Sequence, residues 1–145
     1  MLDLILGIII ISIIILFGGK SINDYFVLLF FGFQYLVFGL IGLFDPLYAS
    51  SLVSFSLNEL VSYSEIRANY SFFVALGILS FYSIYNLKLL KFTYSIFLLV
   101  CGSYAIGRIF SFFLDGYPDR LILIILSVEL FGFFLALWRL KTLTK

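Results

Sequence analysis

Charged side chains are scarce in this sequence. Only 12% of its 145 residues are Asp, Glu, Lys or Arg, whereas 63% are hydrophobic, and the mean hydropathy is +1.19. A water-soluble domain carries about 25% charged residues, so too few are present here to cover a surface that faces water. The sequence therefore predicts an integral membrane protein.

Residues that commonly hold metals and cofactors are also missing or rare. The chain has no His and a single Cys, Cys101. Without His, His-ligated haem and His-containing zinc sites are excluded. One Cys can form neither an intramolecular disulfide nor a Cys-ligated iron–sulfur cluster. The net charge is only +1, and no basic patch is present to neutralise the phosphates of a nucleic acid. We expect no metal, no cofactor and no nucleic-acid partner.

Long apolar runs make up most of the sequence. They cover residues 2–17, 25–44, about 66–85, about 92–114 and about 121–140. A helix needs about 20 apolar residues to cross a bilayer, and these runs are too long and too irregular for membrane strands. Helices also satisfy their own backbone hydrogen bonds in lipid. The predicted fold class is all-α, a polytopic bundle of five transmembrane helices.

The five segments predict one membrane domain over residues 1–145, in which residues 25–140 form a four-helix bundle. Residues 2–17 would be an extra N-terminal helix. This segment has no positively charged start and no convincing cleavage site, which favours a retained helix over a cleaved signal sequence.

Basic residues indicate the orientation of the predicted spans. Six of them fall on one side of the membrane if there are five spans: Lys20, Lys88, Lys91, Arg139, Lys141 and Lys145. Because cytoplasmic loops are enriched in Lys and Arg, this side is expected to be the cytoplasm. The N-terminus would then lie outside and the C-terminus inside.

The longest connection covers residues 45–64, on the predicted outer side. Its apolar residues fall near helical spacing at Leu52, Val53, Leu57, Leu60 and Val61. That spacing suits a short amphipathic helix on the membrane surface. A Ser-rich loop is the alternative interpretation.

Two ionisable residues stand out inside predicted spans, where a charge is costly and usually faces protein or water. Arg108 precedes Asp115 by seven residues, roughly 10 Å below the outer end of its helix. Glu129 follows Arg120 by nine residues, roughly 13 Å below the outer end of the next helix. A tight turn joins these two helices, so they are antiparallel neighbours. We expect Arg108 and Glu129 to meet as an ion pair.

Other polar side chains fall in the same outer half of the predicted bundle. With the ion pair they form a predicted polar cluster: Gln34, Glu65, Arg67, Asn69, Arg108, Asp115 and Glu129. One interpretation is an outward-facing pocket for a lipid headgroup or another amphiphile. The alternative is a structural network that fixes the register of the helices.

Small residues indicate where the predicted helices pack. Gly32, Gly39 and Gly42 mark residues 25–44. Ser103, Gly107 and Ser111 recur at i, i+4 and i+8 in a later span. Small residues let helix backbones approach closely in membranes, so both sets are expected to face a neighbouring helix.

Several short motifs carry a resemblance to a known family. They are Asp45-Pro46, residues 65–68 (EIRA), Gly107-Arg108, residues 115–118 (DGYP) and Glu129. In this order and spacing they resemble a family of small bacterial membrane proteins catalogued as domain of unknown function 4345, over about residues 25–140. The resemblance implies a four-helix domain in a bacterial inner membrane. It also implies that Glu65, Arg67, Arg108, Asp115 and Glu129 belong together, but it supplies no activity.

The sequence contains no nucleophile elbow, phosphate-binding loop or metal-ligand cluster. This favours a non-enzymatic role, as an accessory or assembly subunit of a larger membrane complex. Its partners would be lipids and other proteins, or a second copy of the chain. The first alternative is a lipid- or amphiphile-binding protein that uses the polar cluster, with an enzymatic role left open. The second alternative is a small transporter.

Overall fold

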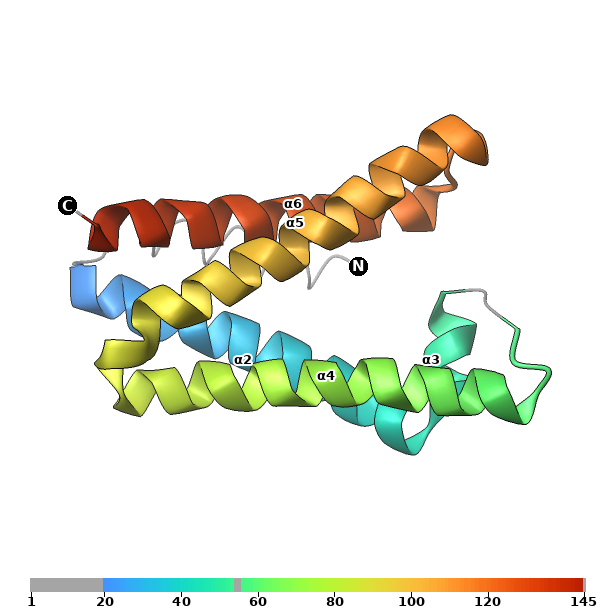
Figure 1. The fold of residues 1–145 in the computed structure, drawn as a ribbon, viewed down its shortest axis with the longest axis horizontal. Helices are drawn as coiled ribbons and strands as arrows, with labels where there is room; N and C mark the ends of the chain where they lie inside the picture. The colour runs from blue at the N-terminus through green and yellow to red at the C-terminus, as the bar shows by residue number, and fades with distance from the viewer. Residues whose placement is uncertain (1–19, 54–55, 145) are drawn as a thin grey trace. The chain divides into compact units, whose positions relative to one another are not determined.

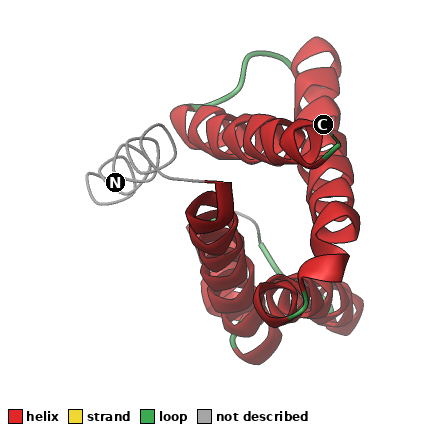
Figure 2. Ribbon diagram, turned by 90° about the vertical axis from the view of Figure 1, so that its left-hand side faces the viewer, coloured by secondary structure: helices red, strands yellow, loops and turns green. Residues whose placement is uncertain are grey.

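The structure is a computed structural model that describes residues 20–53 and 56–144. In that part of the chain Figure 2 shows helices joined by loops and no strand. The predicted all-α class is therefore confirmed. The expected helix over residues 2–17 lies outside the described residues.

Four long helices account for most of the described chain (Figure 1): α2 (Lys20–Phe44), α4 (Leu60–Tyr85), α5 (Leu90–Leu114) and α6 (Arg120–Leu143). Each of the four contains a segment long and apolar enough to cross a membrane. They coincide with the last four apolar runs of the sequence. A single segment in lipid can pair all its backbone N–H and C=O groups internally only as a helix.

Two shorter elements complete the described part. Helix α3 (Pro46–Leu52) follows α2, and a 3₁₀ turn (Leu87–Leu89) precedes α5. Contacts between Cα atoms divide the chain into two compact units, Met1–Asn86 and Leu87–Lys145. The first unit contains α2, α3 and α4, and the second contains α5 and α6. A single membrane domain stays a prediction.

In the first unit α2 and α4 pack directly on each other through glycine. A Cβ atom added to Gly39 would lie 2.6 Å from the backbone nitrogen of Val74. One added to Gly77 would lie 2.8 Å from the backbone nitrogen of Leu36. Added Cβ atoms at Gly32 and Gly42 would meet aromatic rings of α4. The expected packing role of the α2 glycines is confirmed, since only a residue without a side chain allows this approach.

A buried hydrogen bond also joins these two helices. The hydroxyl of Ser80 in α4 donates to the backbone carbonyl of Leu28 in α2 over 2.7 Å. Both residues are fully buried. Replacing Ser80 by Ala is expected to destabilise the protein by about 1 kcal/mol, as measured by unfolding in detergent micelles. The matched change Ser71→Ala removes a hydroxyl that is exposed and bonded only within its own helix. Equal losses in the two variants would contradict a role of Ser80 in joining the helices.

The connection between α2 and α4 differs from both interpretations of its sequence. Its helix is α3, which begins at Pro46 rather than near Leu52. Asp45 caps α3 by accepting a hydrogen bond from the backbone N–H of Tyr48 over 3.0 Å, and proline is well suited to the first helical position. After α3, residues 56–58 form no regular structure. The amphipathic spacing was therefore misleading, because the capping residues decide where this helix begins.

Helix α4 begins about one and a half turns earlier than its apolar run predicts. It starts at Leu60 rather than near residue 66. The additional residues continue the backbone hydrogen bonds of the span beyond its apolar part. As a result Glu65, Arg67 and Asn69 lie inside a helix and not at its first turn.

In the second unit α5 and α6 form an antiparallel hairpin (Figure 1). The carboxylate of Asp119 caps α6 by accepting a hydrogen bond from the backbone N–H of Ile122 over 2.8 Å. Gly116 in the connecting loop has φ +101°, a backbone conformation that glycine adopts readily. A short, well-capped loop joins the end of α5 to the start of α6 and holds these two ends together, as the turn motif predicts.

Candidate functional site

Two charged residues of the α5–α6 hairpin, Arg108 and Glu129, contact each other. Nε of Arg108 lies 2.9 Å from both carboxylate oxygens of Glu129. This is the contact that the lengths of the two helices and their tight connection predict. The pairing satisfies a carboxylate that would otherwise be costly inside a span.

The two partners differ in exposure. The side chain of Glu129 is 15% exposed, whereas that of Arg108 is 30% exposed. Among the described residues, the hydrogen bonds of Arg108 run only from Nε to Glu129. A guanidinium has five N–H donors in a planar fork, so the four N–H groups on the η nitrogens are left for another acceptor. Arg108 is thus the member of the pair that can bind something further.

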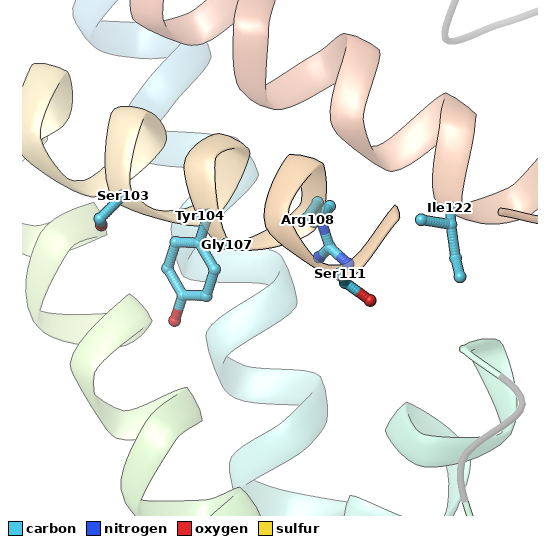
Figure 3. Close-up of a pocket in the computed structure, with 6 residues that line it drawn as sticks. All are labelled: Ser103, Tyr104, Gly107, Arg108, Ser111 and Ile122. Carbon is cyan, nitrogen blue, oxygen red and sulfur yellow. The ribbon is translucent and has the colours of Figure 1, made fainter. Parts of the chain in front are cut away.

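Arg108 lines a recess on α5 and α6, together with Ser103, Tyr104, Gly107, Ser111 and Ile122. Figure 3 shows Arg108, Tyr104 and Ser111 on the same side of α5. Ile122 is the one lining residue from α6, and with Gly107 it adds apolar surface. The recess therefore combines one cation and several hydroxyls with apolar wall.

The two serine hydroxyls of the recess already use their protons. Ser103 donates to the carbonyl of Val100 over 3.0 Å. Ser111 donates to the carboxylate of Asp115 over 2.6 Å. A serine oxygen that has donated its proton can still accept hydrogen bonds. Arg108 therefore offers N–H donors to a ligand, and the two serine oxygens can act as acceptors. Asp115 lies outside the lining but contacts it, because it accepts the hydrogen bond from Ser111.

The small residues of α5 were expected to pack against a neighbouring helix, and within the described residues Gly107 does not. A Cβ atom added to Gly107 would meet nothing within 4 Å. Ser103 and Gly107 are exposed. Their spacing is the same as in a packing motif, so the sequence could not separate a packed face from an open one. In the structure these residues form the wall of the recess.

The remaining members of the predicted cluster lie in the first unit, on α2 and α4. Arg67 is exposed, and its Nε donates to the backbone carbonyl of Leu43 over 3.3 Å. Leu43 belongs to the last turn of α2, where carbonyls lack partners and a cation is favourable. Arg67 therefore acts locally as a contact to the end of α2. Gln34 is half-buried, and Glu65 and Asn69 are exposed.

The structure thus divides the seven predicted residues into two groups. Arg108, Asp115 and Glu129 belong to the α5–α6 unit: Arg108 lines the recess, Glu129 pairs with Arg108, and Asp115 accepts a hydrogen bond from the lining residue Ser111. That all seven form one cluster stays a prediction. In the part of the chain that the structure describes, no three residues of the metal-binding types are grouped to hold an ion. The recess can interact with a ligand through hydrogen bonds and through charge.

Four membrane-spanning helices of this length define a polytopic α-helical membrane protein. The chain belongs to the family described as Domain of unknown function (DUF4345), whose profile matches residues 23–140. This is the family that the motifs of the sequence resemble. No curated protein and no solved structure matches the chain.

Proposed function

We propose that this membrane protein binds the polar head of a lipid or another amphiphile at the recess on α5 and α6. One observation carries the proposal: Arg108 uses only Nε to neutralise Glu129 and keeps its η nitrogens for a further acceptor. A structural ion pair needs no such opening. Cationic donors beside an apolar wall are what an amphiphile with an oxygen-rich head requires.

The location of the recess supports the same function. Arg108 lies six residues before the end of α5 at Leu114, roughly 9 Å along the helix axis. A lipid whose head enters the recess can keep its acyl chains beside the apolar surfaces of the hairpin. The site would then face the outer leaflet of a bacterial inner membrane, in the orientation that the basic residues predict.

The proposal predicts a bound lipid that depends on Arg108. The double variant Arg108→Gln, Glu129→Gln keeps the pair neutral but removes the cationic donors. We expect it to retain about tenfold less lipid than the wild type after purification in mild detergent, because charge-assisted hydrogen bonds are lost. Mass spectrometry of lipids bound to the purified full chain would measure this ratio.

The matched control is Arg120→Gln, which removes an exposed arginine from the first turn of α6 in the same unit. It is expected to retain lipid at the wild-type level. Equal lipid retention by wild type, double variant and control would contradict the proposal. A stoichiometric protein partner in the same preparation, with no bound lipid, would instead favour the accessory subunit that the sequence predicts. That role and the transporter both stay predictions.

A further inference from the structure

We infer that the headgroup bound at this recess is a zwitterionic phosphate–ammonium group. Its phosphate would contact the η nitrogens of Arg108, and its primary ammonium would contact Asp115. The inference rests on the proposed function, because it names the class of lipid that the same recess would take.

The polar residues of α5 run along one face of the helix. Arg108, Ser111 and Asp115 are spaced i, i+3 and i+7, which places them on one face over two turns. Ser111 and Asp115 are in direct contact, since the hydroxyl donates to the carboxylate over 2.6 Å. A cationic donor therefore lies seven residues before the C-cap of α5, and a carboxylate lies at that C-cap. A ligand that follows this face meets a positive group and then a negative one.

The charges around the recess do not favour a headgroup with a net negative charge. The positive charge of Arg108 is already opposed by Glu129 at 2.9 Å. Asp115 adds a second carboxylate on the same face of α5, and its side chain is exposed. An anionic head would gain from Arg108 but would be repelled by both carboxylates. A head that carries a phosphate and an ammonium has net charge zero and meets a complementary group at each end.

The kind of ammonium follows from the acceptors available. The carboxylate of Asp115 can only accept hydrogen bonds, and the oxygen of Ser111 has donated its own proton. A primary ammonium has three N–H donors to offer them. A quaternary ammonium has none and would contribute charge alone. The recess therefore fits phosphoethanolamine better than phosphocholine.

The test uses the full chain purified in mild detergent. It is incubated with equal amounts of phosphatidylethanolamine, phosphatidylcholine and phosphatidylglycerol that share the same acyl chains. Native mass spectrometry then measures which lipid remains bound. We expect phosphatidylethanolamine to be retained about tenfold over phosphatidylglycerol, the ratio that one charge-assisted hydrogen bond supports.

Asp115→Asn is the decisive variant, because asparagine can still accept the hydrogen bond from Ser111 but carries no charge. Its preference for phosphatidylethanolamine over phosphatidylglycerol is expected to fall to about one, while total lipid retention changes little. Asp119→Asn removes the same charge from the same loop and still provides a good helix cap, so it should keep the wild-type preference.

The outcomes separate this inference from the proposed function. If wild type holds phosphatidylglycerol as strongly as phosphatidylethanolamine, or if Asp115→Asn keeps the preference, the zwitterionic assignment is wrong and amphiphile binding stands. If wild type holds no lipid above the level of the Arg108→Gln, Glu129→Gln variant, both are wrong. Water-soluble phosphoethanolamine is added as a competitor. Displacement of the lipid at similar concentrations would show that the recess binds a soluble phosphate compound, and it would contradict a lipid as the ligand.

Discussion

Replacing Arg108 by glutamine is expected to lower the free energy of unfolding by about 3 kcal/mol. The change leaves the carboxylate of Glu129 inside a span without its cation, and removing one partner of a buried pair costs about 3–5 kcal/mol. The low end applies because the side chain of Arg108 is 30% exposed. Replacing Glu129 by glutamine should cost a comparable amount, since Arg108 then loses its only carboxylate partner among the described residues. Denaturant unfolding in mixed micelles would measure both.

The double variant supplies the comparison. With both charges removed, Arg108→Gln, Glu129→Gln is expected to be within about 1 kcal/mol of the wild type, because neutral amides of similar size can replace a buried pair with little loss. A double variant as unstable as the sum of the two singles would show that they do not act as a pair. Near-normal stability of the double variant is also what allows its lipid retention to be interpreted as a binding effect.

The second large effect is expected at the glycines between α2 and α4. Gly39→Ala places a Cβ atom 2.6 Å from the backbone nitrogen of Val74, and a backbone atom cannot rotate away. The two helices must separate, and overpacking of this kind costs about 2 kcal/mol. Gly77→Ala places its Cβ atom 2.8 Å from the backbone nitrogen of Leu36 and should cost a similar amount. Thermal unfolding followed by circular dichroism in detergent would measure these losses.

Gly107→Ala is the matched control for these two variants. It makes the same substitution in a membrane-spanning helix, but its added Cβ atom meets no atom within 4 Å in the described part of the chain. We expect stability equal to the wild type or slightly higher, because alanine favours a helix more than glycine does. A loss at Gly107 as large as that at Gly39 would indicate that close packing of α2 on α4 is not what makes Gly39 sensitive.

Much of the fold follows from local properties of the chain. Four of the five apolar runs predict the four long helices of the described chain, because backbone polar groups must be satisfied inside each segment in lipid. The ion pair between Arg108 and Glu129 also follows from the sequence. A tight loop fixes two antiparallel helices, and counting residues from that loop places both charges at similar depth.

Other features could not be obtained from spacing. The helix in the connection after α2 begins at Pro46, because Asp45 caps it, although the apolar spacing suggests a helix further on. Two sets of small residues looked alike in the sequence. Gly39 is held against a backbone, whereas a Cβ atom added to Gly107 would meet none of the described residues within 4 Å. Spacing reports which residues share a face of a helix, but not what lies opposite that face.

The candidate site shows the same division. Hydropathy and spacing were enough to identify the membrane class, the four described spans and the meeting of Arg108 with Glu129. The folded arrangement was needed to show that Arg67 contacts the end of α2, and that Arg108 opens onto a recess lined by Ser103, Gly107 and Ser111. Helix length and depth are properties of one segment or one hairpin, and they can be counted along the chain. Which atoms of a side chain remain available depends on contacts between segments, and those exist only in the folded protein.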